Sequence, residues 1–128
     1  MTKAELLRQI LRGRLLLVGE FRGARAELAG FVDKRTGEAI SYVRAIYLLE
    51  CACRGVVDRA VIRKRFLDVE KPEDVLFPYE KGKLYVFSLE SFKVERGAFN
   101  GWMDHREPEL IEAAEDGDGP AVGGPAPP

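Results

Sequence analysis

Alternation of apolar and polar positions is the strongest pattern in the chain, and it predicts β-strands. The side chains of Tyr85, Phe87 and Leu89 fall on one face of an extended segment, with more polar positions on the other face. We therefore expect a strand over Leu84–Val94, followed by a flexible turn around Gly97. Large apolar residues follow this turn with little chain left to cover them: Phe99, Trp102 and Met103.

A long β-hairpin is predicted earlier in the chain. Apolar segments over Leu15–Phe31 and Ile40–Cys53 flank a turn at Lys34–Gly37. If Asp33 pairs with Glu38, the register is fixed. It places Arg44 opposite Glu27, Tyr42 opposite Ala29, and Ile40 opposite Phe31.

This register divides the hairpin into two faces. One face is nearly continuous in apolar residues and is assigned to the core: Ser41, Val43, Ala45, Tyr47, Leu49, Cys51 and Cys53. The opposite face carries Arg25, Phe31, Ile40, Tyr42 and Arg44. Cys51 and Cys53 leave the strand on the same side, which rarely meets disulfide geometry, so both are expected to be reduced core residues.

A third strand is predicted over Val56–Phe66, after a tight turn at Arg54–Gly55. Its apolar side chains Ala60, Ile62 and Phe66 point one way, and a row of arginines points the other way: Arg59, Arg63 and Arg65. Such a row can be a ligand surface, or simply a solvated edge whose cations prevent aggregation.

Less regular segments lie at both ends and between the strands. Thr2–Glu5 has capping-box spacing and predicts a short helix up to Gly13, which either packs on the mouth of the barrel or contacts a neighbouring molecule. Leu67–Gly82 is expected to be a loop with one helical turn near Pro72–Val75. Pro108–Ala114 is expected to form two helical turns, and the Gly/Pro-rich end is expected to be disordered.

Together these elements predict a mainly β fold, a small five-stranded OB-like antiparallel barrel with a long hairpin. The expected organisation is an N-terminal helical extension over 1–13, the barrel over 14–106, and an acidic flexible tail over 107–128. The chain has no apolar run long enough to span a bilayer and no clear signal-peptide layout, so a cytoplasmic protein is expected.

The charges are segregated along the chain. Residues 22–66 hold ten basic and five acidic residues, whereas residues 104–128 hold seven acidic residues and one arginine. A basic middle with an acidic tail is typical of a polyanion-binding surface whose tail screens it or recruits a partner. An ordinary solvated mixture of charges is the alternative.

Residue types that support catalysis are scarce. The single histidine, His105, has no cysteine or carboxylate cluster at metal-ligand spacing, and no Gly-rich phosphate loop is present. We therefore expect no enzyme, no cofactor and no metal site. Aromatic residues interleaved with arginines on short strands instead match the requirements of single-strand binding, in which cations follow the phosphates and flat side chains stack on bases.

The chain resembles the gene-V-type single-stranded DNA-binding proteins of filamentous bacteriophages. The resemblance rests on Leu84-Tyr85, on the run from Leu89 through Ser91-Phe92-Lys93-Val94, and on Phe99 and Met103. A weaker similarity extends upstream to about Leu15, so that roughly two thirds of the chain is covered.

The resemblance implies roles for individual residues. Gly37 matches the tip of the family's DNA-binding wing, Arg35 a basic wing residue, and Ile40 and Tyr42 the contact positions that follow. Arg63, or Lys64 in a shifted register, matches a phosphate-binding lysine, and Phe99 matches an aromatic at the tip of the dimer-forming hairpin. The chain departs from the family at Ile40, where the pattern has a tyrosine, and in Glu27 and Arg44, which suggest a salt bridge in place of a bare cation.

The resulting hypothesis is a dimeric protein that coats single-stranded DNA without sequence preference during replication of a phage or related element, in the host bacterial cytoplasm. The expected DNA-binding residues are Arg25, Lys34, Arg35, Ile40, Tyr42, Arg44, Arg59, Arg63, Arg65 and Phe99, and the expected dimer interface is Phe99, Trp102 and Met103. The acidic tail is expected to bind the chain's own basic face or a replication partner. The alternatives are an RNA-binding translational repressor, or a dimeric protein-interaction module without nucleic-acid binding.

Overall fold

Extended strands make up most of the part of the chain that the structure describes, as the alternation predicts. The computed structural model describes residues 1–51 and 59–111. Its elements in chain order are α1 (Lys3–Leu11), β1 (Leu16–Val32), β2 (Ala39–Cys51), β3 (Arg59–Phe66), the 3-10 helix η1 (Pro72–Asp74), β4 (Leu84–Glu95), β5 (Ala98–Met103) and β6 (Glu109–Leu110). The prediction of a mainly β fold with one short α-helix is confirmed.

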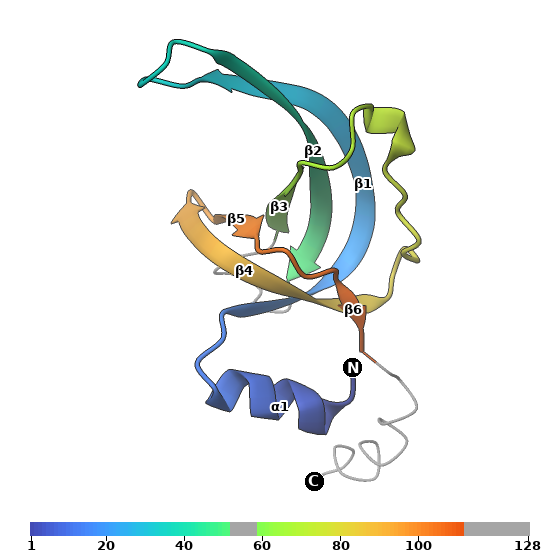
Figure 1. The fold of residues 1–128 in the computed structure, drawn as a ribbon. Helices are drawn as coiled ribbons and strands as arrows, with labels where there is room; N and C mark the ends of the chain where they lie inside the picture. The colour runs from blue at the N-terminus through green and yellow to red at the C-terminus, as the bar shows by residue number, and fades with distance from the viewer. Residues whose placement is uncertain (52–58, 112–128) are drawn as a thin grey trace, which may run out of the picture.

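Five of the strands pair into a ring. The order is β1-β2-β3-β5-β4, and β4 returns to pair with the first part of β1 (Figure 1). The pairs are antiparallel except for β3 and β5, which run parallel. The expectation of a purely antiparallel arrangement is therefore wrong at this one pair, because the chain crosses from β3 to β4 before β5 returns beside β3.

The β1–β2 hairpin has the register predicted from the sequence. Glu27 pairs with Arg44, Ala29 with Tyr42, and Phe31 with Ile40. The turn is closed by the amide of Asp33, which donates to the carbonyl of Glu38 at 2.8 Å. Gly37 adopts a φ of 74°, a conformation that favours glycine. Because β3 pairs with β2 only from Val43 onward, the end of the hairpin extends beyond the ring (Figure 1).

The core lies on the inner face of the ring, where β2 supplies the residues expected from its alternation. Val43, Ala45, Tyr47 and Leu49 are buried there, and the ring of Tyr47 lies 5.6 Å from that of Phe87. Ser41 was also assigned to the core but is exposed, because it lies on the part of the hairpin beyond β3. Cys51 is partly buried against the core, whereas Cys53 lies outside the described residues.

The segment between β3 and β4 contributes to the core although it is mostly irregular. The predicted helical turn is confirmed as η1, and Val75 directly after it is buried. Phe77 and Tyr79 then pack against the core, with the Phe77 ring 5.6 Å from that of Tyr47. This segment is therefore fixed in place by apolar contacts.

Helix α1 forms as predicted, with Thr2 as its N-cap and a complete capping box with Glu5. It buries none of its residues, and its apolar side chains Leu7, Ile10 and Leu11 are more than half exposed. The expectation that these side chains pack on the mouth of the barrel is wrong. Contact between the helix and a neighbouring molecule stays a prediction.

The chain after β5 forms a strand where helical turns were expected. Glu109 and Leu110 of β6 pair with Val86 and Tyr85 of β4, and the amide of Ile111 donates to the carbonyl of Leu84 at 3.0 Å. The helical prediction for this part is wrong, because β4 offers a free edge with unpaired backbone groups. Within residues 1–51 and 59–111, no helix is long and apolar enough to cross a membrane.

Candidate nucleic-acid interface

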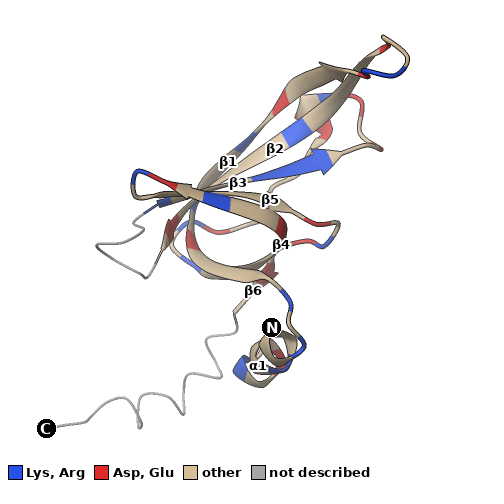
Figure 2. Ribbon diagram, turned by 90° about the vertical axis from the view of Figure 1, so that its left-hand side faces the viewer, with Lys and Arg blue, Asp and Glu red and all other residues tan. Residues whose placement is uncertain are grey.

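The outer face of β2, β3 and β5 gathers basic and aromatic side chains. Strand alternation on β3 directs Ala60 and Ile62 into the core, where they are at most 1% exposed, and it directs the arginine row outward as predicted. Arg65 pairs with Arg44 of β2, so the basic segments of the two strands lie side by side (Figure 2). We call this surface the cationic face and define it by Arg25, Tyr42, Arg44, Arg59, Arg63, Arg65 and Trp102.

Arg65 lies between two aromatic rings. Its guanidinium carbon is 4.6 Å from the centroid of Trp102 and 5.9 Å from that of Tyr42. Both contacts run diagonally across the sheet, because Arg65 pairs with Arg44 while Trp102 pairs with Arg63. The guanidinium is attracted by the negative faces of the rings, which holds a cation and two flat platforms together.

Glu27 neutralises part of the cationic face. The Arg44 Nε donates to its Oε2 at 3.1 Å, a guanidinium nitrogen of Arg44 bonds to the same oxygen, and the Arg25 Nε lies 4.0 Å from its Oε1. The hydrogen bond from Arg44 is the main reason that the pKa of the Glu27 carboxyl lies below its ordinary value. The salt bridge expected from the sequence is confirmed. Within residues 1–51 and 59–111, the arginines of the face that form no ion pair are those on β3.

Arg63 and Lys64 lie on opposite faces of β3. Arg63 points outward, and its Nη1 lies 3.4 Å from the Oδ1 of Asn100. Lys64 points inward and is 6% exposed, with its Nζ 2.7 Å from Oε1 of Glu107. Of the two, only Arg63 can meet a ligand on the outer face.

Lys64 belongs to a polar cluster on the inner side of the sheet, together with Tyr79 and Glu107. The Tyr79 hydroxyl donates to Oε2 of Glu107 at 3.0 Å, and Lys64 holds Oε1 of the same carboxylate. Burial raises the pKa values of the Tyr47 and Tyr79 hydroxyls. Burial also acts to raise the pKa of Glu107, but the hydrogen bonds from Lys64 and Tyr79 outweigh it and leave that pKa below its ordinary value.

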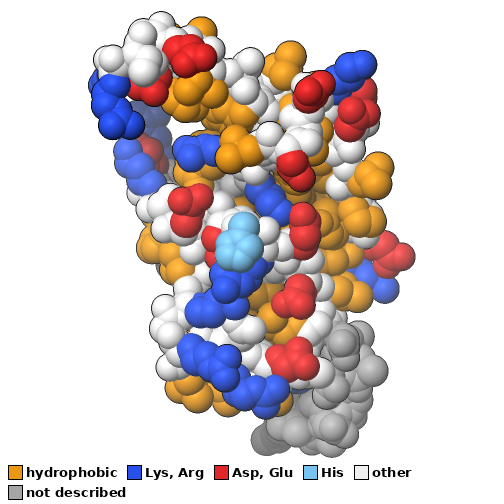
Figure 3. Space-filling view, in the orientation of Figure 1, with side chains coloured by type: hydrophobic (Ala, Val, Ile, Leu, Met, Phe, Trp, Pro, Cys, Tyr) orange, Lys and Arg blue, Asp and Glu red, His pale blue; other side chains and the backbone are white. Residues whose placement is uncertain are grey.

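The hairpin tip extends the basic surface away from the ring. Lys34 and Arg35 are exposed in the turn, and basic side chains lie along the left-hand margin of the molecule near this tip (Figure 3). Phe31 is 54% exposed, and its ring lies 6.2 Å from that of Tyr42. Ile40, which pairs with Phe31, is partly buried on the same face.

The residues after the last turn are divided between the two faces of the ring. Phe99 pairs with Ala60 on the inner face, where it is partly buried and stacks on Phe92 at 5.0 Å, so it does not share the cationic face. Met103 is only 3% exposed in the single chain, which contradicts the expectation that little of the chain is left to cover it. Trp102 points outward and supplies the aromatic group that was expected from Phe99.

Trp102 was missed as part of the candidate site although its strand carries a detectable signal. Phe99, Gly101 and Met103 alternate with Asn100 and Trp102, which separates inner from outer positions.

In the described residues there is no cluster of three or more His, Cys, Asp and Glu side chains that could hold a metal ion. The arrangement thus offers cations and flat apolar surfaces for binding.

Three comparisons were made between this chain and known proteins. Neither the models of protein families, nor the curated proteins, nor the solved structures gave a significant match.

Proposed function

We propose that this protein binds single-stranded DNA along the cationic face without strong sequence preference. The observation that supports this most directly is Arg65, held between Tyr42 and Trp102 and adjacent to Arg63. Exposed arginines can follow a phosphate backbone, while aromatic faces stack on unpaired bases of any identity. Duplex DNA keeps its bases stacked on one another, so it would use only the cations.

The arrangement of strands supports the same proposal. We infer that the ring of five strands is an OB-type barrel, a fold that binds oligonucleotides with the face of strands 2 and 3 and with the loops between strands 1 and 2 and between strands 4 and 5. The cationic face lies on β2 and β3, and the first of these loops carries Lys34 and Arg35. The turn between β4 and β5 carries Arg96.

A role in replication of a phage or related element is part of this proposal, as the resemblance to gene-V-type proteins implies. In that role the protein acts by binding alone, as a homodimer that coats an exposed strand. RNA offers similar phosphates and unpaired bases, so the preference for DNA has to be measured. An acidic protein segment is the competing ligand for the same arginines.

Titration of a fluorescent oligo-dT at increasing salt concentrations tests the proposal. Each phosphate neutralised on a single strand contributes about −0.7 to the slope of log affinity against log salt, so roughly three to five contacts per subunit give about −2 to −3.5. Oligo-U and duplex DNA are titrated in parallel, and we expect duplex DNA to bind more weakly than oligo-dT because its bases are already stacked on one another. A slope near zero, or no binding to any of the three, would contradict the proposal.

A further inference from the structure

Four side chains follow one another across the outer face of the sheet, from β5 to the β1–β2 hairpin. The guanidinium carbon of Arg65 lies 4.6 Å from the centroid of the Trp102 ring and 5.9 Å from that of Tyr42. The Tyr42 ring in turn lies 6.2 Å from the ring of Phe31. We call Trp102, Arg65, Tyr42 and Phe31 the aromatic ladder. Its members come from four adjacent strands, β5, β3, β2 and β1, so it runs diagonally across the sheet.

Phe31 lies on the same face as Tyr42 but outside the ring of strands. Ala29 pairs with Tyr42, and Phe31 follows Ala29 by two residues, so alternation puts the Phe31 and Tyr42 side chains on the outer face. The partner of Phe31 is Ile40, three residues before Val43, where β3 begins to pair with β2. At about 3.4 Å per residue, the ladder therefore extends roughly 10 Å beyond the paired part of β3.

Core packing does not account for an aromatic side chain at Phe31. Its ring is 54% exposed, and in the described part of the chain it is neither a core residue nor packed against the core. Lys34 and Arg35 are exposed in the turn that follows, and Arg65 lies on the other side of Tyr42. An exposed aromatic ring between two groups of cations suits a single strand, because bases stack on the ring while phosphates meet the cations.

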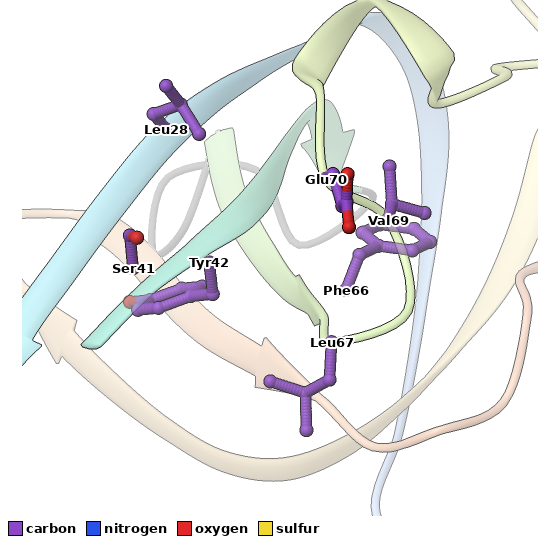
Figure 4. Close-up of a pocket in the computed structure, with 7 residues that line it drawn as sticks. All are labelled: Leu28, Ser41, Tyr42, Phe66, Leu67, Val69 and Glu70. Carbon is purple, nitrogen blue, oxygen red and sulfur yellow. The ribbon is translucent and has the colours of Figure 1, made fainter.

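A pocket of about 240 Å³ lies on the inner side of the same hairpin. It is lined by Leu28, Ser41, Tyr42, Phe66, Leu67, Val69 and Glu70 (Figure 4). Leu28 pairs with the buried Val43, and Phe66 packs against the core, which places this wall on the opposite side of the sheet from the arginines. A strand held by Arg65 stays on the outer face, where its bases meet the exposed ring of Phe31 instead of this pocket.

We propose that Phe31 is a second stacking platform for a base of the bound strand, and that the strand follows the aromatic ladder from Trp102 to the hairpin. This inference rests on the proposed function. A base can stack on the exposed side of the Phe31 ring while neighbouring phosphates contact Arg65 or the basic turn. Every base has a flat aromatic face, so this platform adds affinity without adding sequence preference.

The test compares oligo-dT of about ten nucleotides, within the site sizes of single-strand binding folds, with an abasic strand of the same length. The abasic strand keeps the phosphates and lacks the bases. We expect Phe31→Ala to weaken binding of oligo-dT by about five- to thirtyfold, within the range for loss of one stacking platform, and to change binding of the abasic strand by less than about twofold. Affinities are measured by fluorescence anisotropy at low salt, where phosphate contacts alone bind measurably.

Two further substitutions at the same position separate stacking from apolar contact. Phe31→Tyr keeps the flat ring and should bind oligo-dT nearly as the natural protein does. Phe31→Leu keeps an apolar side chain without a ring, so it should lose affinity as Phe31→Ala does. None of the three should change the melting temperature by much, because Phe31 does not pack against the core.

The matched control is Leu28→Ala, on the same strand. Leu28 is 64% exposed, similar to Phe31, but its side chain lies on the inner side of the sheet. The control should therefore bind oligo-dT and the abasic strand as the natural protein does.

Three results would overturn the inference, and they differ from failure of the proposed function. Unchanged binding of oligo-dT by Phe31→Ala would show that no base stacks there. An equal loss of affinity for oligo-dT and for the abasic strand would show that Phe31 only shapes the hairpin. A larger loss in Leu28→Ala than in Phe31→Ala would place the strand on the inner side. Absence of oligo-dT binding by the natural protein would instead reject the proposed function, and this inference with it.

Discussion

Arg65 illustrates how single side chains prepare the cationic face for a ligand. A free arginine loses much rotamer freedom on binding, whereas Arg65 already lies between the rings of Trp102 and Tyr42. Part of the conformational entropy of this side chain is therefore already lost when the protein folds, before DNA binds. A base that stacks on Tyr42 meets a guanidinium that is already in position beside it.

The contribution of Tyr42 can be measured by removing its ring. Tyr42→Ala should weaken binding of oligo-dT by about 1–3 kcal/mol, the usual loss for one stacking platform. The melting temperature should change little, because Tyr42 lies on the outer face and is only partly buried. Tyr42→Phe keeps the ring and should bind nearly as the natural protein does. A large fall in melting temperature for Tyr42→Ala would show that the residue supports the fold.

Glu107 makes the stability of the fold depend on pH. Its pKa is lowered in the folded protein, so its contribution is complete above the ordinary value of 4.5 and is lost as the pH falls through the folded value. Protonation would also leave the buried Lys64 without an anionic partner. Urea denaturation between pH 3 and 7 should show stability falling on the acid side of this range.

The variant Glu107→Gln isolates this contribution. It should be less stable at pH 7 by about 1 kcal/mol, since the buried ammonium of Lys64 loses a charged partner whose own side chain is 61% exposed and screened by solvent. Between pH 3 and 5 its stability should depend less on pH than that of the natural protein. Asp104 and Glu27 also have lowered pKa values, so some acid dependence should remain in the variant. Identical pH profiles for the two proteins would contradict the role assigned to Glu107.

Local patterns were enough to predict which face of the sheet most side chains of the hairpin and of β3 occupy, because the side-chain period of a strand follows directly from the sequence. The Glu27–Arg44 salt bridge followed from the register in the same way. The inward direction of Lys64 follows from the same alternation, but its ion pair with Glu107 was not predictable, since Glu107 is 43 residues away. Phe99, Trp102 and Met103 were grouped by their apolar character, although their positions on β5 separate them.

At the scale of elements, predictability follows the distance between partners along the chain. The β1–β2 register is set by a short turn and by alternation on both sides. The parallel pairing of β3 with β5 and the addition of β6 to β4 join segments that are distant in sequence, and no local pattern specifies them.

The β4–β5 hairpin is the element on which a dimer is expected to form. Phe92 and Val94 are 51% and 49% exposed on the inner side of this hairpin, and Phe92 stacks on the partly buried Phe99. An exposed apolar patch of this kind can satisfy itself by two-fold pairing with a second copy. Met103 contributes to the core of its own subunit, so this patch replaces the interface expected from the sequence.

Sedimentation velocity at micromolar concentration tests this pairing. We expect the natural protein to be a dimer and Val94→Glu to be a monomer, because the glutamate would place two charges at the two-fold contact. The control is Leu67→Glu, which changes a residue that is 85% exposed and follows β3, outside both β4 and β5. It should leave the dimer intact. A monomeric natural protein would remove the β4–β5 interface from the proposal.

At the scale of the whole molecule, we expect the distribution of charge along the chain to affect DNA binding more than the net charge does. The net charge is −1, yet residues 112–128 carry four acidic residues and no basic ones, and β3 presents its arginine row outward. An acidic segment attached to the same chain competes with DNA for the cations at a high effective concentration. Salt screens this competition, because the Debye length falls from about 30 Å at 0.01 M to about 8 Å at 0.15 M.

The fold determines where the acidic segment can be truncated without disturbing the sheet. Glu107 holds Lys64, and β6 pairs with β4, so the ordered sheet continues past residue 106, where the barrel was expected to end. Removal of residues 107–128 would therefore damage the sheet as well as remove charge. A truncation after Ile111 keeps every described contact of β6 and removes the four acidic residues of the segment.

We expect this truncation to tighten oligo-dT binding several-fold at about 0.01 M salt and to have little effect at 0.15 M or above, where the charges are screened. The matched control keeps the full length but replaces the four acidic residues: Glu112→Gln, Glu115→Gln, Asp116→Asn and Asp118→Asn. If competition is electrostatic, the control should bind as the truncated protein does. If only the truncation tightens binding, the segment obstructs the face by its bulk, and unchanged affinity in both would show that it does not reach the cationic face.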